Sequence, residues 1–384
     1  MKKILLFLLI LFFPFALWAK PIKVVLLNPG GTHWFWQMSI DFMKASAEDL
    51  NMELEVITSD WNHYLTIQQM KEIAKRKNPP DYIITGNEKS IAGKIIEIAD
   101  RAGIDIFLFS NGFVRQSDHD TYGEPREKYK HWIGQMIPDN FSVGYQIGKI
   151  LIQEALLKNL TAPDGLVHIA AISGAYGTHS SIERVRGLHQ IVDEYKNHVK
   201  LLQVISANWD GKSAEEITER LFKRYGEINV IWGANDTMAM GAINAVTLFG
   251  KTPGTEVLVG GCGWYPPAIE KVSEGVLTTT VGGHFMDAGW VMVLLHDYHH
   301  GHDFIADGIQ STMQSIDQSN VQRYKDIFGT PDWRKIDFKK FSKVYTPSLK
   351  KYDFRLEKIL DQFEPTAPSP TGSPTTSDEQ RPSR

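Results

Sequence analysis

Three consecutive aromatic residues lie in the stretch GGTHWFWQM, where Trp34, Phe35 and Trp36 follow two glycines and open a helix-like pattern. A flat aromatic ring can cover the C–H face of a small ring-shaped molecule, while amide and guanidinium groups bind its hydroxyls. Trp36 shares helical spacing with Ile40 and Met43, so we assign it to a buried core. Trp34 and Phe35 lie beside the start of that helix, and we predict that they form one wall of a binding site. The alternative is a packing cluster at the edge of a domain.

Polar or aromatic residues follow most of the predicted strands of this chain. In open α/β sheets, ligands bind at the carboxyl ends of the strands, where such side chains meet. We therefore expect one site for a small polar ligand, polyhydroxylated or of mixed polarity, and no cofactor. Besides Trp34 and Phe35, the predicted site residues are Asn87, Ser110, Asn111, Arg184, Trp209, Asn235, Cys262, Trp264 and His284.

Two features suggest reactive or metal chemistry, and each has a simpler interpretation. Cys262 or His284 would react if the protein were an exported enzyme, yet no assembled catalytic set accompanies them. The run HDYHHGH places His296, His299 and His300 on one helix face, which is a conceivable metal site. A histidine-rich helix C-terminus, favoured by the helix dipole, explains the same spacing. We therefore predict a binding protein without catalytic residues and without a metal.

Strand and helix patterns alternate along the chain from residue 23 to about residue 283. Apolar runs such as KVVLLN, DYIIT, LVHIAAIS and NVIWG precede segments of helical periodicity, the first of them over residues 34–50. This order predicts parallel sheets with helices on both faces. The units are too many for one ordinary open sheet, so we predict two similar doubly wound α/β domains. In the second domain, Ser213 and Glu216 suggest a capping box for a helix that ends at Gly226.

The first 19 residues have the features of a cleaved signal peptide. Two lysines precede an apolar run from Ile4 to Leu17, and Ala19 is a small residue at a cleavage position. An uncleaved membrane anchor is the alternative, but Pro14 interrupts the run and the run is short for a membrane span. We predict an exported, periplasmic protein that begins near Lys20.

Charge and cysteine content exclude some classes of protein. Removal of residues 1–19 takes away two lysines and no acidic residue, so the formal net charge changes from −4 to −6. A mildly acidic chain without a long basic run is a poor candidate for binding nucleic acid. Cys262 is the only cysteine, so no internal disulfide can form. From about residue 364 the chain is rich in Pro, Ser and Thr, and we predict a disordered tail there.

Several segments, in this order, resemble the type I periplasmic binding proteins, which include ribose- and galactose-binding proteins and the related autoinducer-2 receptor. The resemblance extends over roughly residues 23–315 and is carried by NPGGTHWFWQMSIDF, HWIGQMIPDNFSVGYQIG, SGAYGTHSSIERVRGL, ANWDG, WGANDTMAMGAINA and VLVGGCGW. It implies two α/β lobes joined by a three-segment hinge, with the ligand in a cleft between them. The chain would cross between lobes near residues 136–138, near Gly283 and near Thr312.

The resemblance also implies roles for individual residues. Trp34 and Phe35 correspond to the paired aromatics that stack on the ligand. Arg184 corresponds to the arginine that binds ligand hydroxyls, with Arg186 as a less favoured candidate. Trp209 corresponds to a second aromatic of the cleft, and Asn235 to the asparagine of an Asn-Asp pair.

Three positions depart from the pattern of the sugar-binding members. Ser110 and Asn111 stand where an Asp-Arg pair is common, and Cys262 stands where an aspartate is common. Gly283, followed by His284, stands where a glutamine is expected. These departures favour a less hydroxylated, modified or more apolar ligand over a plain pentose or hexose, and Trp264 would add apolar surface.

The expected division of the chain follows from the three crossings. Residues 20–136 and 284–312 would form the N-terminal lobe, residues 137–283 and 313–345 the C-terminal lobe, and residues 346–384 a C-terminal extension. Lobes that close on a ligand present a joint surface to a membrane partner. We therefore expect a monomer that delivers its ligand to an ABC permease. The alternative is a receptor that docks on a sensor kinase or cyclase, and neighbouring permease and ATPase genes would favour transport.

Overall fold

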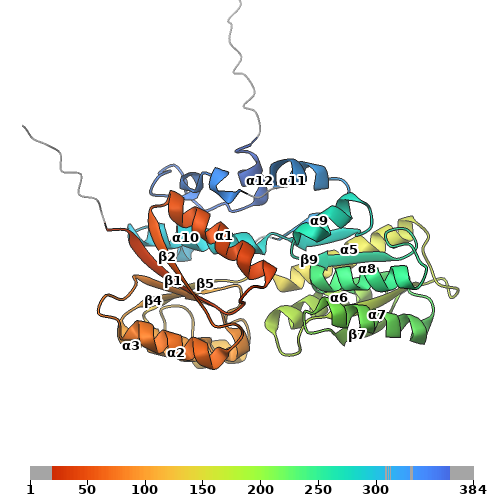
Figure 1. The fold of residues 1–384 in the computed structure, drawn as a ribbon, viewed down its shortest axis with the longest axis horizontal. Coiled ribbons are helices and arrows are strands. Elements are labelled where there is room, and N and C mark those ends of the chain that lie inside the picture. The colour runs from red at the N-terminus through yellow and green to blue at the C-terminus, as the bar shows by residue number, and fades with distance from the viewer. Residues whose placement is uncertain (1–19, 308, 310, 312, 329–331, 364–384) are drawn as a thin grey trace, which may run out of the picture.

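A computed structural model describes residues 20–307, 309, 311, 313–328 and 332–363. The expected signal peptide, the crossing expected at Thr312 and the expected tail from residue 364 lie outside these residues. Figure 1 shows two lobes side by side, with the C-terminal segment above both of them. Within the described part of the chain, no helix combines the length and apolar character that a membrane span requires.

The N-terminal lobe is built on a five-stranded parallel sheet of order β2-β1-β3-β4-β5. Side chains of β1 alternate between two apolar clusters, because Val24 and Leu26 face one side of the sheet while Val25 and Leu27 face the other. Helices therefore cover both faces, which explains the unbroken apolar run of this strand. The elements are β1 (Ile22–Asn28), α1 (Trp34–Asp49), β2 (Met52–Thr58), α2 (His63–Ala74), β3 (Tyr82–Thr85), η1 (Glu88–Ser90), α3 (Ala92–Ala102), β4 (Asp105–Phe109), α4 (Gln116–Tyr122), β5 (Trp132–Met136) and, later in the chain, η2 (His284–Met286), α10 (Asp287–His299) and η3 (Ile305–Asp307).

The C-terminal lobe repeats this plan with one added strand. Its sheet has the order β11-β10-β9-β8-β6-β7, and all pairs are parallel except β10 with β11. The expected pair of doubly wound lobes is thereby confirmed. The elements are α5 (Asn140–Leu157), β6 (Val167–Ser173), α6 (His179–Glu194), β7 (Val199–Ser206), α7 (Gly211–Tyr225), β8 (Val230–Gly233), α8 (Asp236–Leu248), β9 (Leu258–Cys262), α9 (Pro266–Ser273), β10 (Thr279–Gly282), β11 (Gln314–Ile316) and α11 (Val321–Phe328).

The start of α7 differs from the sequence prediction. The helix begins at Gly211, and the side chain of Asp210 caps it by accepting a hydrogen bond from the backbone of Ser213 at 2.7 Å. The capping box expected at Ser213 and Glu216 is therefore wrong by one turn, since Ser213 already lies inside the helix.

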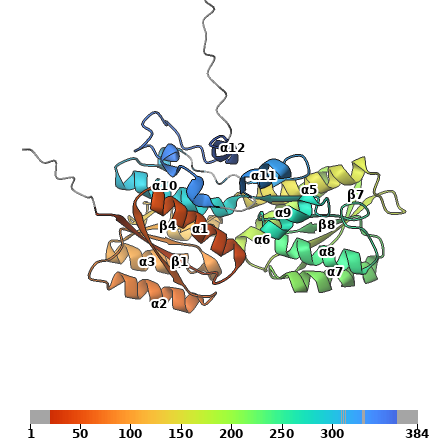
Figure 2. The ribbon, with the colours of Figure 1, turned by 45° about the horizontal axis from the view of Figure 1, so that its top comes forward.

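The segment after α11 returns to the N-terminal lobe. It contains η4 (Trp333–Lys335), η5 (Phe338–Phe341) and α12 (Leu356–Leu360), which lie above α1 and α10 in Figure 2. Phe42 of α1 packs edge-on against Trp333 and Phe338, with ring centroids 5.4 and 5.3 Å apart. Trp290 of α10 packs against Phe354 at 4.9 Å. This packing differs from the expected division, which placed residues up to 345 with the C-terminal lobe.

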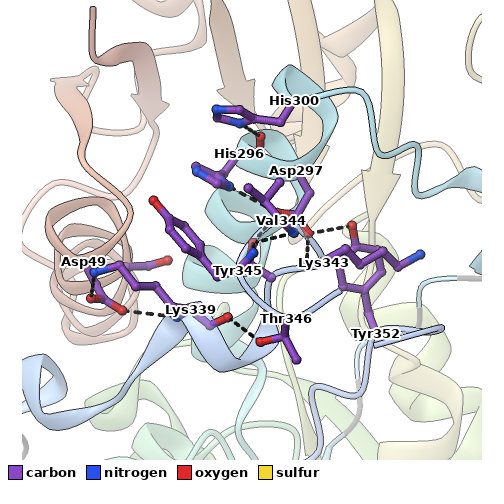
Figure 3. A network of polar contacts seen from close by, with 12 residues as sticks. Asp49, His296, Asp297, His300, Lys339, Lys343, Val344, Tyr345, Thr346 and Tyr352 are labelled. Carbon is purple, nitrogen blue, oxygen red and sulfur yellow. Dashed lines mark hydrogen bonds and ion pairs between the residues drawn. The ribbon is translucent and has the colours of Figure 1, made fainter. Parts of the chain in front are cut away.

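A buried carboxylate fixes this segment to α10 (Figure 3). Asp297 is fully buried and accepts hydrogen bonds from the Ser342 hydroxyl, the Lys343 backbone at 2.6 Å and the Tyr352 hydroxyl at 3.0 Å. Its carboxylate also lies 3.1 Å from Nδ1 of His296. Burial alone would raise the pKa of Asp297, but these hydrogen bonds outweigh it and lower that pKa.

Candidate functional site: a cleft between the lobes

A cavity of about 540 Å³ lies where the carboxyl ends of strands from both lobes meet. Its lining comes from loops after β1, β2, β3 and β4 and from the corresponding loops of the C-terminal lobe. This is the position at which doubly wound sheets bind ligands. Nine of the eleven residues predicted from sequence line it: Trp34, Phe35, Ser110, Asn111, Arg184, Trp209, Asn235, Cys262 and His284.

The start of α1 places two aromatic rings on the wall of the cleft. His33 caps the helix by accepting a hydrogen bond from the backbone of Phe35, so Trp34 and Phe35 occupy the first turn. Nε1 of Trp34 donates to Thr237 of the other lobe at 3.0 Å, and its ring lies 4.7 Å from that of Tyr265. Trp34 therefore contacts the opposite lobe. Trp36, which was assigned to the core, is buried in the core cluster but also lines the cavity.

Arg184 supplies the cation inside the cleft. It is only 5% exposed, and its guanidinium is held by two hydrogen bonds: Nε donates to Asn140 at 2.9 Å, and Nη1 donates to the carbonyl of Ala234 at 2.7 Å. The ring of Trp209 lies 5.8 Å from the guanidinium carbon. Nη2 takes part in neither bond, so a fixed guanidinium retains donors for ligand oxygens. By contrast, Arg186 pairs with Glu183 on the surface.

His284 lines the cavity and has a buried ring nitrogen, Nδ1, without a hydrogen-bond partner among the described residues. Its ring stacks on Phe35 with centroids 4.7 Å apart. Burial, assisted by Arg184, lowers its pKa well below the ordinary value, so the imidazole is neutral at pH 7. A buried polar atom without a partner costs free energy, so the unpaired Nδ1 is an unfavourable feature of the cleft lining.

Asn235 and Cys262 complete the C-terminal side of the cleft. Asn235 caps α8 by accepting a hydrogen bond from the Met238 backbone at 2.8 Å, a bond that leaves its amide nitrogen unused. Cys262 ends β9 and is 1% exposed. Burial, together with Asp236, raises the pKa of its thiol to about 12 against the opposing effect of Arg184. The thiol is therefore protonated at neutral pH and is a poor nucleophile.

Substitution of Cys262 tests the enzymatic alternative. We expect native protein at pH 8 to resist alkylation by iodoacetamide, because the thiol is buried and protonated, and to react once guanidinium unfolds it. Cys262→Ser should change ligand affinity only modestly. Conversion of the ligand by the native protein but not by Cys262→Ser would show instead that the protein is an enzyme.

Sequence reasoning missed a carboxylate in the cleft. Glu88 follows β3 and lines the cavity, where its side chain accepts a hydrogen bond from Asn111. Burial raises the pKa of Glu88, although that hydrogen bond and nearby Lys89 act in the opposite direction. The Glu88–Asn111 pair thus offers polar atoms near the position where the sugar-binding members have an Asp-Arg pair. The proximity of Glu88 to the end of a predicted strand was a usable signal.

Two predicted residues do not line the cavity. The side chain of Asn87 accepts a hydrogen bond from the Ala92 backbone at 3.0 Å and donates to the carbonyl of Gly112, so it holds the start of α3. Trp264 is 1% exposed, donates through Nε1 to the carbonyl of Gln314 at 3.1 Å and packs against Tyr324. Both residues have structural contacts that account for their positions.

The histidine-rich helix end has other contacts. Besides the contact between His296 and Asp297, Nδ1 of His299 lies 3.2 Å from the Tyr82 hydroxyl, and Nδ1 of His300 lies 2.8 Å from the His296 carbonyl. Across the described ranges, no group of three or more His, Cys, Asp or Glu residues has a metal-binding arrangement. The helix-dipole explanation of the run stays a prediction.

Residues 24–299 match the family model described as a periplasmic binding protein domain. The chain belongs to this family. A solved periplasmic sugar-binding protein from Pseudomonas fluorescens is 30% identical with a TM-score of 0.78, and the match covers 88% of this chain and 99% of that one. The resemblance stated from the sequence is thus confirmed.

Two curated relatives match parts of the chain. The D-allose-binding periplasmic protein of Escherichia coli is 33% identical over 39% of this chain, but the match spans only 45% of that relative. The ribose import binding protein of Haemophilus influenzae is 22% identical over 63% of this chain and 73% of its own length. These relatives are binding proteins by name, which agrees with the expectation that this chain is not an enzyme.

Proposed function

We propose that this protein is a periplasmic solute-binding protein that closes on a small carbohydrate or carbohydrate-like ligand and delivers it to an ABC permease. The observation that carries the proposal is the convergence of stacking rings and free polar groups from opposite lobes on one cavity. Trp34 and Phe35 come from one side, and Arg184 and Asn235 from the other. Only a closed cleft lets one ligand touch all four residues.

The chemistry of the lining suits a neutral molecule with both C–H faces and hydroxyls. Among the described lining residues, Arg184 is the one buried cation, burial raises the pKa of the Glu88 carboxyl group, and His284 is neutral. A guanidinium donates to hydroxyl oxygens in a planar arrangement, while aromatic rings pack on the apolar face of a sugar ring. The names of the relatives, which include allose-, ribose- and apiose-binding proteins, support a carbohydrate.

Titration calorimetry against D-allose, D-ribose, D-apiose, D-galactose and myo-inositol tests the proposed ligand class. We expect at least one to bind, with a decrease in the radius of gyration in small-angle scattering as the lobes close. Native mass spectrometry of gently purified protein would identify a co-purified ligand. A bound molecule without hydroxylated rings, together with no binding in the panel, would refute the carbohydrate proposal.

A further inference from the structure

The cavity extends past the predicted site along the edge of the N-terminal lobe. Beyond Trp34, its lining continues through His33 to Trp61 and His63, at the loop between β2 and α2. The volume of about 540 Å³ falls within the range of roughly 300–1,000 Å³ that holds drug-sized ligands. The cavity is therefore not limited to one small ring.

Trp61 and Trp209 occupy equivalent positions in the two lobes. Strand β2 lies at the edge of the first sheet next to β1, and β7 lies at the edge of the second next to β6. Trp61 comes three residues after the end of β2, and Trp209 three residues after the end of β7. The segments read SDWN and ANWD. The same local structure thus presents one tryptophan from each lobe.

The backbone of these two loops matches in detail. Asp60 and Trp61 have φ values of 50° and 63°, and Asn208 and Trp209 have φ values of 51° and 68°. In each loop the next residue caps the following helix: Asn62 accepts from Leu65 at 3.1 Å, and Asp210 accepts from Ser213 at 2.7 Å.

A left-handed backbone is unfavourable at a tryptophan, so each loop bears a local conformational free-energy cost. In both loops this conformation accompanies a ring at the cavity wall. Trp209 is one of the aromatics that the family resemblance assigned to the ligand. Trp61 has the same conformation and lines the same cavity, yet no role was predicted for it.

Aromatic contacts connect Trp61 to the inner part of the cleft. The Trp61 ring lies 6.4 Å from that of His33, which lies 5.8 Å from that of Trp34. Burial lowers the pKa of His33, so this link is an uncharged ring at neutral pH. Trp61 itself is 50% exposed, which leaves one of its surfaces accessible at the outer end of this row.

We propose that Trp61 forms an outer subsite that stacks on a second ring of the ligand. The preferred ligand is then a disaccharide, or a glycoside whose second group is a ring, rather than a free monosaccharide. One sugar ring occupies the inner site at Trp34, Arg184 and Trp209, and the next ring lies against Trp61. This inference rests on the proposed carbohydrate-binding function and specifies its substrate class.

The test compares free sugars with ring-extended forms on matched variants. The probes are D-glucose, D-galactose, D-ribose and D-allose, the α- and β-p-nitrophenyl glycosides of these sugars, and the disaccharides cellobiose, maltose and lactose. The variants are Trp61→Ala, Trp61→Phe and Trp209→Ala, with Tyr64→Ala as the control. Tyr64 is 71% exposed and does not line the cavity. Melting temperatures establish that each variant is folded.

We expect a ring-extended form to bind the native protein about 10-fold more tightly than its free sugar. Trp61→Ala should remove this gain and leave the affinity for the free sugar nearly unchanged, while Trp61→Phe keeps part of the gain. Trp209→Ala should weaken both forms, and Tyr64→Ala should weaken neither.

Three outcomes would overturn the outer subsite alone. The first is equal affinity of native protein for free and extended sugars, and the second is an equal loss for both forms in Trp61→Ala. The third combines two measurements: both Trp61→Ala and Tyr64→Ala bind sugars normally, but cells that carry these variants no longer take up the sugar. This result would show that the surface around Trp61 contacts a membrane partner. Absence of binding to every sugar in either form would refute the proposed function as well.

Discussion

Replacement of Arg184 by alanine is expected to weaken ligand binding by about 30- to 1,000-fold, which corresponds to roughly 2–4 kcal/mol. Arg184 is 5% exposed, and its guanidinium is fixed by Asn140 and the Ala234 carbonyl. Its hydrogen bonds to a ligand therefore form away from water and without further loss of side-chain entropy. Calorimetry with the ligand identified by the carbohydrate panel measures the loss.

Arg186→Ala provides the matched control for this prediction. Arg186 lies on the same helix, pairs with Glu183 on the surface and does not line the cavity. Its removal should leave affinity unchanged. Trp34→Ala should cost roughly 1–3 kcal/mol of binding through lost stacking area. If Arg184→Ala and Trp34→Ala bind normally but melt far below the native protein, these residues form a scaffold and the site lies elsewhere.

Replacement of Asp297 by alanine is expected to lower the free energy of unfolding by about 3–5 kcal/mol. The change removes the acceptor of three hydrogen bonds that join α10 to Ser342, Lys343 and Tyr352, and it leaves their donors buried. Chemical denaturation measures the change. Asp353→Ala is the control, because Asp353 pairs with Arg355 near the surface and such a pair contributes about 0–1 kcal/mol.

The pH dependence of this effect follows from the lowered pKa of Asp297. A carboxylate with a lowered pKa in the folded state stabilises the protein above its unfolded pKa of about 3.9, and that stability is lost as the pH falls through the folded value. The difference in stability between native protein and Asp297→Asn should therefore be full near pH 7 and shrink below about pH 4. A difference that stays constant from pH 7 to pH 3 would contradict an ionised Asp297.

The sheets and the general location of the site were predictable because their signals are local. The apolar run Val24 to Leu27 is buried on both faces of a parallel sheet. A strand of this kind is apolar throughout, whereas a half-exposed strand alternates apolar and polar residues, so the two are distinguished from sequence. The rule that ligands bind at strand ends then placed nine of the predicted residues around one cavity. Whether these nine contact a ligand stays a prediction.

The direction of individual side chains was not predictable from position alone. Cys262 is the last residue of β9, and Trp264 follows it two residues later. Trp264 has a left-handed backbone with φ 61°, and its ring packs on Tyr324, sixty residues later in the chain. Asn87 and Glu88 are adjacent, yet the side chain of the first bonds the backbone at the start of α3 and the second lines the cleft. These outcomes depend on distant packing partners, which no local pattern contains.

The packing of residues 332–363 against the N-terminal lobe was not predicted, for a related reason. The aromatic residues of this segment show neither strand alternation nor a long helical period, and their partners lie on α1 and α10, far away in the sequence. The segment also contacts the C-terminal lobe, where Gln314 donates to Glu357 at 2.6 Å. This contact of the segment with both lobes could only be recognised once its partners were known.

The buried state of Cys262 has a practical consequence for optical assays. Because the only native thiol is inaccessible and protonated, a cysteine introduced at the cleft rim would be the single site for a maleimide dye, with no need to remove the native one first. Tyr176 suits this purpose, since it is 81% exposed and lies between cavity-lining Ala175 and Thr178. Closure of the lobes would change the environment of a dye at this position. Ligand binding would therefore be measured as a change in the fluorescence of the labelled protein.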